Sequence, residues 1–303
     1  MRLINPKVEI LHQELGVEGI AKQIERVGRT CYKSEDKIAE GTAKTFVDRM
    51  IKSNHLAMCE HGTIYIGISD TAAVAPIYEG MIPFYEKNPY SKVIITTSGH
   101  IHTAFITTNL RVLAENNRMR DLKYHQEPTR YHAKRVCMKF TTSIGVSREF
   151  NRHRAFSIAE QSTRYCNYTK DKFNDEVTFI IPSWLDIPTG QYVYWDGDWC
   201  DIDKMKIQMD ADQKNEANIL LHFLQDAEDS YKILINKGWK PQQAREVLPL
   251  STATEVVYTG FLDDWKHFFD LRYREITGAA HPNARQVAAR AHNLILKELD
   301  IDL

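Results

Sequence analysis

The chain has 303 residues, of which 43% are hydrophobic and 26% are charged, and its formal net charge is −1. These values are typical of a soluble globular protein with a large core. The near-neutral charge excludes a global basic field that would draw the protein onto nucleic acid. No apolar run approaches the roughly 20 residues of a membrane-spanning helix, and the N-terminus lacks the apolar core of a signal peptide. We therefore expect a cytoplasmic protein with no membrane or nucleic-acid partner.

Cysteine and histidine spacing gives no sign of a metal or disulfide framework. The five cysteines are scattered, odd in number, and form no Cys-x-x-Cys pair, which argues against disulfides and structural zinc. His100 and His102 share one side of a predicted strand, but a histidine pair without a third ligand is weak evidence for a metal. We expect reduced, packed thiols and no metal site.

The first half of the chain mixes helix and strand signals. Apolar residues recur at helical spacing in residues 20–27 and 38–51, and a further helix is predicted over 109–116. Alternating apolar residues or β-branched runs predict strands over 62–68, 93–97, 101–107 and 134–142. Strands 93–97 and 101–107 flank Ser98-Gly99, which predicts a hairpin between them.

The second half is mainly helical. Residues 176–181 predict a strand that Pro182 ends, and the Gly-, Asp-, Trp- and Tyr-rich residues 188–203 predict an ordered loop or a small excursion. Helices are expected from about 202 to 236, from Pro241 through Arg245, from Asp263 or Asp264 to about 274, and from 281 or 282 to about 299. Residues 254–259 fit a strand or a helix.

Strands and helices do not alternate regularly along this chain. The pattern therefore favours an α/β domain of α+β character over a doubly wound sheet. We expect a central mixed or antiparallel sheet with flanking helices.

The most informative stretch is residues 148–168. Its charged residues are five basic and two acidic: Arg148, Arg152, His153, Arg154 and Arg164, with Glu149 and Glu160. Cations this close repel one another unless an anion or a polarised ring joins them. In extended backbone Arg152 and Arg154 would share a side, as would Ser162 and Arg164, and each pair would offer donors to a ligand. With Glu160 to accept from a ribose hydroxyl, these are the groups that hold a nucleotide monophosphate.

Two other interpretations of this stretch stay open. Many Arg- and Glu-rich segments are solvated surface ion-pair clusters that contribute little energy. An RNA-binding loop is the other, because Tyr165 and Tyr168 are able to stack on bases. No Gly-rich dinucleotide or P-loop motif is present in the sequence.

The spacing of Arg152-His153-Arg154, seven residues and then Ser162 resembles the signature of the flavin-dependent thymidylate synthases, which make dTMP from dUMP. Other blocks follow in that family's order: Ser34 after residues 29–32, His55 with Glu60-His61, residues 244–250 with Arg245, and residues 268–272 with Arg272. The resemblance implies the thymidylate synthase-complementing protein fold. It also implies a single domain over residues 1–303 with a probable hairpin–helix insertion at 70–135, and a homotetramer whose active sites are built from several subunits.

The resemblance further implies a reaction. Methylenetetrahydrofolate (the 5,10-methylene form) is the one-carbon donor, NADPH reduces FAD, and FAD donates the hydride that completes the methyl group. The implied substrate-binding residues are Arg152, Glu160, Ser162, Arg164, Arg245 and Arg272, of which Arg272, Arg164 and Ser162 are the implied catalytic residues. The implied cofactor-binding residues are Ser34, His55, Glu60, Arg152, His153, Arg154 and His267. Ser162 has no adjacent base in the sequence, so we expect it to bind the nucleotide and not to act as a nucleophile.

A non-catalytic nucleotide- or RNA-binding protein that kept the Arg-His-Arg motif is the alternative. Its support is that Ala57, Ala159 and Phe261 stand where members of the family often have other residues.

Overall fold

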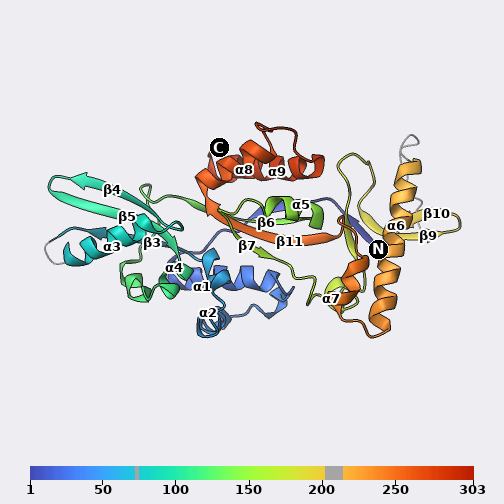
Figure 1. The fold of residues 1–303 in the computed structure, drawn as a ribbon, viewed down its shortest axis with the longest axis horizontal. Coiled ribbons are helices and arrows are strands. Elements are labelled where there is room, and N and C mark those ends of the chain that lie inside the picture. Colours follow the sequence, from blue (N-terminus) through green and yellow to red (C-terminus); the bar gives the residue numbers. More distant parts are fainter. Residues whose placement is uncertain (72–74, 202–213) are drawn as a thin grey trace.

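The computed structural model describes residues 1–71, 75–201 and 214–303, which form three small sheets with helices packed around them (Figure 1). The central sheet has the strand order β2-β6-β11-β7 and is antiparallel throughout. Its strands are β2 (Lys7–Ile10), β6 (Arg135–Ser143), β11 (Ala253–Phe261) and β7 (Ser157–Glu160). This arrangement confirms the predicted fold class, with two further sheets beside the central one.

Helices cover both faces of the central sheet. On one face α5 (Ile144–Phe150), α8 (Leu262–Arg272) and α9 (Pro282–Leu299) share a core with Val256 and Tyr258. On the other face α1 (Gly16–Thr30) packs against Val257. Because successive strand residues point to opposite faces, neighbouring residues of β11 serve different cores. Figure 1 shows α8 and α9 on one side of β11 and α1 on the other.

The second sheet has the order β3-β5-β4 and is also antiparallel. Its strands are β3 (Thr63–Ser69), β4 (Lys92–Ser98) and β5 (Ile101–Asn109). Helices α3 (Ala75–Lys87) and α4 (Leu110–Glu115) and the 3-10 helix η3 (Met119–Tyr124) accompany it. Its apolar core is continuous with α1, α2 (Thr42–Lys52) and the 3-10 helix η2 (Leu56–His61). Residues 70–135 therefore do not build a core of their own.

The third sheet has the order β10-β9-β1-β8. It contains β1 (Arg2–Ile4), β8 (Thr178–Ile180), β9 (Gly190–Trp195) and β10 (Asp198–Asp201), and β1 runs parallel to β8. Helices α6 (Lys214–Asn236) and α7 (Pro241–Ala244) share its apolar core. Another 3-10 helix, η4 (Asp171–Phe173), precedes β8.

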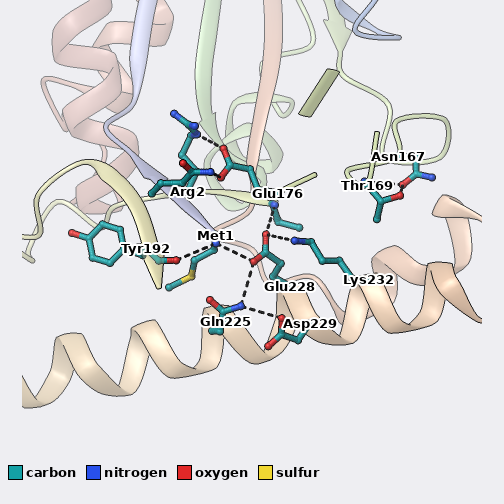
Figure 2. Close-up of polar contacts among 12 residues, drawn as sticks. Met1, Arg2, Asn167, Thr169, Glu176, Tyr192, Gln225, Glu228, Asp229 and Lys232 are labelled. Carbon is teal, nitrogen blue, oxygen red and sulfur yellow. Dashed lines mark hydrogen bonds and ion pairs between the residues drawn. The ribbon is translucent and has the colours of Figure 1, made fainter. Parts of the chain in front are cut away.

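A buried ion pair ties the N-terminal strand to α6 (Figure 2). The Met1 ammonium lies 3.0 Å from Glu228 Oε2, and both groups are buried. The other oxygen of Glu228 accepts the Val177 N–H at 2.7 Å, and Lys232 lies 3.5 Å from it. A buried carboxylate needs such partners, since desolvation of an unpaired charge costs several kcal/mol.

Most local predictions are confirmed. The helices at 20–27 and 38–51 are α1 and α2, although α2 begins only at Thr42 because Gly41 has a φ of 77°. The hairpin around Ser98-Gly99 is β4–β5, and Asn109 caps α4 by accepting the Val112 N–H at 3.1 Å. The strand at 134–142 is β6, and the last helix starts at Pro282 after the cap residue His281.

Other predictions are corrected, decided between alternatives or confirmed only in part. Up to residue 201, where the described range ends, the segment expected to be an ordered loop or a small excursion is the β9–β10 hairpin. Asp196 and Gly197 both have positive φ (50° and 79°) and make its tight turn. Residues 254–259 are strand, paired on both sides by β6 and β7. The predicted helix from about 202 to 236 falls partly on residues outside the described ranges, and its described part is α6. The strand at 176–181 is confirmed only over 178–180.

Two further corrections concern helix ends. Helix α7 stops at Ala244, so Arg245 starts the 3-10 helix η5 (Arg245–Val247). Helix α8 begins at Leu262, and Asp264 accepts the Phe261 N–H at 2.9 Å from inside its first turn. All five cysteines are free thiols. Within the described ranges, we find no helix with the length and apolar character that crossing a membrane requires.

Candidate active site

Arg272, the last residue of α8, binds the segment at the end of α5. Its Nε atom donates to His153 Nε2 at 3.0 Å. Its terminal nitrogens donate to the Glu149 carboxylate at 3.1 Å and to the Glu149 carbonyl oxygen at 2.9 Å. These bonds use the rigid donor fork of a guanidinium. The structure thus joins His153 and Arg272, two predicted site residues that are far apart in the sequence.

The His153 ring is buried beside aromatic side chains. Its centroid lies 5.0 Å from that of Phe268 and 6.1 Å from that of His267. Burial, and then the proximity of Arg272 and His267, lower the pKa of His153 to about 4. The ring is therefore neutral at pH 7. Since Nε2 accepts from Arg272, its proton is on Nδ1.

Glu160, on β7, faces α5 and is held by neutral donors. Ser147 Oγ donates to Oε1 at 2.7 Å and Thr254 Oγ1 donates to the same oxygen at 3.2 Å. Asn151 Nδ2 donates to Oε2 at 3.2 Å. No cation pairs with Glu160 within the described residues. These three bonds fix the orientation of the Glu160 carboxylate, and no described cation neutralises its charge. The carboxylate is therefore able to bind a positively charged or hydrogen-bond-donating group.

The turn that contains Ser162 and Arg164 lies against the end of α1. The Ser162 N–H donates to the Cys31 carbonyl oxygen at 2.8 Å, and the Ser162 hydroxyl accepts the Arg164 N–H at 3.3 Å. Arg245 reaches the same turn, where Nη1 donates to Thr163 Oγ1 at 2.8 Å. The hydroxyl of Ser162 therefore contacts a backbone donor and not a base.

A cavity of about 780 Å³ opens beside this turn. Predicted residues Ser34 and His55 line it, together with Cys31 and Tyr32 of the segment that holds Ser162. The Tyr32 ring lies 5.5 Å from the Tyr165 ring, so the cavity and the turn are neighbours. Glu115 is an acidic residue of the lining, and the basic residues come from α-helices and 3-10 helices: Arg29, Lys37, Arg49, Arg111 and Lys172. Such a lining favours a ligand with several negative charges.

Glu60 stands behind this cavity and is held from two sides. Its carboxylate pairs with Arg111, which lines the cavity, and Arg111 also binds Glu115 at 3.0 Å. Its carbonyl oxygen accepts two bonds of 3.2 Å from the terminal nitrogens of Arg135. Glu60 thus fixes the position of η2, and its carboxylate is already paired.

The predicted residues do not form one cluster in a single chain. Ser34, His55 and the Ser162 turn lie on the α1 side of the central sheet, whereas His153, Glu160 and Arg272 lie on the α5 and α8 side. The extended backbone under which the pairs Arg152–Arg154 and Ser162–Arg164 would each share a side is not found. Residues 152–154 belong to the turn between α5 and β7, and residues 162–164 belong to the turn after β7.

Three predicted cations are exposed. Arg152 and Arg154 make no side-chain hydrogen bond or ion pair with any described residue, and Arg164 lies over the Tyr165 ring at 5.4 Å. His267 is also exposed and lies five residues before Arg272 on α8. These groups are free to bind a ligand or a partner subunit.

The sequence did not point to several residues of these sites. Glu149, Ser147 and Asn151 hold Arg272 and Glu160, and their roles depend on contacts between distant segments. Arg111 and Glu115 have the i, i+4 spacing of a helical ion pair. That spacing indicates the pair, but it gives no hint that Arg111 also reaches Glu60.

Comparison with known proteins identifies a family. Residues 125–299 match the family model described as thymidylate synthase complementing protein. A flavin-dependent thymidylate synthase of Pyrococcus furiosus is 31% identical over 192 residues, covering 62% of this chain and 64% of the relative. One of Synechocystis is 23% identical over 168 residues, covering 54% and 66%. The alignments therefore span just under two thirds of each relative's own length.

Among solved structures, the UMP/dUMP methylase PolB of Streptomyces cacaoi bound with 5-Br dUMP is similar to this chain with a TM-score of 0.43. Its sequence identity is 16%, covering 98% of this chain and 93% of PolB. The family model matches more than half of the chain, and its matched region includes the Arg-His-Arg turn, Glu160, Ser162, Arg245 and Arg272. The chain therefore belongs to the thymidylate synthase complementing protein family.

Proposed function

We propose that this protein is a flavin-dependent thymidylate synthase that converts dUMP to dTMP. Its one-carbon donor would be 5,10-methylenetetrahydrofolate, and its hydride would come from FAD reduced by NADPH. The observation that carries the proposal is the basic cavity lined by Ser34 and His55 beside the Ser162 turn. A basic cavity next to the residues expected to bind a nucleotide supports this proposal.

FAD fits the residues that line this cavity. Lys37, Arg49 and Lys172 would hold the diphosphate, which a Gly-rich loop would otherwise bind. Arg29 and Arg111 add positive charge to the lining, but Arg29 already pairs with Glu25, and Arg111 with Glu60 and Glu115. Ser34 and His55 offer hydrogen-bonding groups, and the 780 Å³ volume is in the range of cofactor sites. When bound, FAD supplies the hydride that completes the methyl group. The protein's own residues bind and orient the reactants.

The nucleotide would be held by Arg152, Arg164 and Arg245 with Ser162 and Glu160. Arg152 and Arg164 are exposed and would bind its phosphate through bidentate hydrogen bonds. Glu160, already oriented by three donors, would accept from a ribose hydroxyl. Arg272 would stabilise negative charge that develops on the uracil carbonyls. Neutral His153 would keep the Arg272 guanidinium in position.

We further infer that one active site uses residues of more than one subunit, in a homotetramer. The cavity and the Arg272 cluster lie on opposite faces of the central sheet, so one chain does not bring them to the same ligand. The exposed, unpaired guanidiniums of Arg152 and Arg154 are suited to reach a neighbouring subunit's cavity.

The test is dTMP formation from dUMP, methylenetetrahydrofolate and NADPH at low oxygen, with and without added FAD. We expect product only when FAD is present, whether added or retained on purification. Arg152→Ala should abolish turnover, whereas Arg120→Ala, at an exposed position in η3, should retain it. Absence of product from folded protein that binds dUMP would favour the non-catalytic alternative.

A further inference from the structure

A second cavity, of about 310 Å³, lies where the central sheet meets the β3-β5-β4 sheet. It is lined by residues 10–16, which begin at the last residue of β2, and by His61 and Thr63 around the start of β3. His125, Glu127 and Pro128 also line it, as do residues 134–137 of β6 and the position before it. It shares no lining residue with the basic cavity, which η2 separates from it. A ligand here would therefore not compete directly with FAD.

Three buried polar atoms without a partner belong to side chains that line this cavity. They are His61 Nε2, His125 Nε2 and Arg135 Nε, and no described residue forms a hydrogen bond with any of them. Buried polar groups are nearly always satisfied, because leaving one unpaired costs about 1–3 kcal/mol. Three unpaired atoms from three separate segments at one cavity indicate a polar ligand.

Arg135 determines the charge of that ligand. Its terminal nitrogens donate only to neutral acceptors, the Glu60 carbonyl oxygen and the hydroxyls of Thr63 and Ser157. In the described part of the chain no carboxylate pairs with it. Burial lowers the pKa of Arg135, yet a guanidinium stays charged under physiological conditions. The carboxylates of Glu60 and Asp264 act on it only through space, and the Phe261 ring lies 5.6 Å from it. Since a buried cation without an anion in direct contact is costly, the missing contact partner is an anion.

The two histidines determine the rest of the ligand. His125 Nδ1 lies 3.0 Å from the Tyr65 carbonyl oxygen and therefore carries the proton, so in the neutral ring Nε2 is an acceptor. Burial and the charge of Arg135 lower the pKa of His61 to about 3, which leaves that ring neutral. The ligand needs a hydrogen-bond donor for His125.

The rest of the lining has an apolar part and an exposed polar part. Ile10, Leu11, Val136 and Leu299 form the apolar part, which favours a ring or short hydrocarbon body. The exposed polar part is formed by His12, Glu14, Glu127 and Lys134. Nowhere in residues 1–71, 75–201 and 214–303 do three His, Cys, Asp or Glu side chains gather to hold a metal ion. A small organic molecule fits this combination of walls and polar atoms.

We propose that this cavity binds a small ring-bearing carboxylate that also carries a hydroxyl or amino donor. Its carboxylate accepts from Arg135 Nε, its donor binds His125 Nε2, and its ring packs on the apolar walls. This site is distinct from the flavin and nucleotide sites, and the proposal does not depend on the proposed function.

The probes are the three hydroxybenzoate isomers, which place the hydroxyl at different distances from the carboxylate. Each is titrated into the whole protein by calorimetry, beside benzoate, which lacks the donor, and the matching hydroxybenzamides, which lack the charge. We expect one isomer to bind about tenfold or more tightly than benzoate, because benzoate lacks the hydroxyl that donates to His125. We expect the same isomer to bind about tenfold or more tightly than its own amide, because the amide lacks the charged acceptor for Arg135. Saturating FAD should not displace it.

Two variants locate the site. His125→Ala should reduce the affinity for that isomer to the affinity for benzoate, and His100→Ala, at the exposed tip of the β4–β5 hairpin, should leave it unchanged. Arg135→Gln should abolish binding if the variant folds, and His125→Ala keeps the test valid if it does not. Equal binding of carboxylates and amides, no binding at millimolar concentration, or binding indifferent to His125→Ala would overturn the proposal and leave the cavity to water.

Discussion

Arg272 and His153 form one unit, because the Arg272 Nε–H donates to His153 Nε2 at 3.0 Å across the gap between α8 and the turn after α5. A protonated His153 would have no lone pair at Nε2 and would repel the guanidinium. The histidine therefore positions the arginine only while it is neutral, and burial keeps it neutral at pH 7. The remaining bonds of Arg272, to Glu149, fix the plane of the guanidinium.

Replacing Arg272 with lysine keeps a positive charge but loses the fork that binds Glu149 and His153. We expect kcat/KM for dTMP formation to fall about 100-fold, as for the loss of charged hydrogen bonds worth about 2–3 kcal/mol. Arg274→Lys is the matched control on the same segment, since Arg274 pairs with Asp270 at the surface. Steady-state kinetics on both variants checks this, and a wild-type rate for Arg272→Lys would contradict the assigned role.

Stability should fall at acid pH because of His153. Its folded pKa of about 4 lies below the value of about 6.5 in an unfolded chain. Between these values the unfolded state binds a proton that the folded state does not, so stability is complete above pH 6.5 and is lost as pH falls toward 4. The loss from this group is up to about 3 kcal/mol.

Urea denaturation of the wild type and of His153→Gln at several pH values measures this dependence. Glutamine is able to accept from Arg272 but does not titrate in this range, so the free energy of unfolding of the variant should change less between pH 7 and pH 4. Some dependence should remain, since His61 has a pKa of about 3 and acts in the same direction. Parallel curves for the two proteins would exclude His153 as a source of the acid sensitivity.

Active sites shared between subunits predict complementation. His55→Ala removes a group at the basic cavity, and Arg152→Ala removes an exposed cation on a different segment. Each variant alone should be inactive. When the two are unfolded together and refolded as mixed oligomers, some sites receive both native residues, so part of the activity should return. A mixture as inactive as its components would indicate that each chain builds its own site.

Arg111 should affect flavin binding through Glu60. Arg111→Gln leaves the Glu60 carboxylate without its cation at the edge of the basic cavity. We expect FAD affinity to fall about tenfold or more, because a cation is lost from the lining and Arg111 no longer neutralises Glu60 behind the cavity and Glu115 in its wall. Flavin fluorescence titration measures the change. Arg118→Gln, on the next segment but away from that cavity, is the control, and equal affinities in the two variants would rule out a specific role for Arg111.

Glu228→Gln should lower stability without changing turnover per folded molecule. The substitution leaves the buried Met1 ammonium without a carboxylate (Figure 2), and breaking such a pair costs about 3–5 kcal/mol. Asp229→Asn, at the exposed next position of α6, should cost little. Thermal unfolding of the wild type and of both variants measures this difference. A midpoint for Glu228→Gln as high as that for Asp229→Asn would contradict the stabilising role of the Met1–Glu228 ion pair.

Local sequence patterns were sufficient to predict some helices and strands but not others. The buried face of α1 and the β4–β5 hairpin could be predicted because their signals lie within a few neighbouring residues. Residues 254–259 were ambiguous because β11 is buried on both faces, and a strand covered on both sides lacks alternation. The dipeptide Asp196-Gly197 is a signal for a hairpin turn. The Gly, Asp, Trp and Tyr residues around it are also typical of an ordered loop, so the sequence alone does not predict the β9–β10 hairpin.

The motif predicted which residues are near a ligand, but not their arrangement. Ser162 reaches Cys31, and Glu60 reaches Arg111, through contacts between segments that are far apart in the sequence. No local periodicity encodes such contacts. The assignment of His153 and Ser34 to opposite faces of the sheet follows from strand order, which depends on the pairing of β11 with β6 and β7.

The strands of residues 2–10 have partners that are made much later during synthesis. Strand β2 pairs with residues 138–141, and β1 pairs with residues 178–180 and 190–191. At about 5–20 residues per second, the ribosome needs roughly ten seconds or longer to supply the last of these partners. Throughout that interval the emerging chain exposes apolar strand residues such as Leu3 that are buried in the finished protein. A nascent chain of this kind is a natural client for a chaperone that binds extended apolar segments at the ribosome exit.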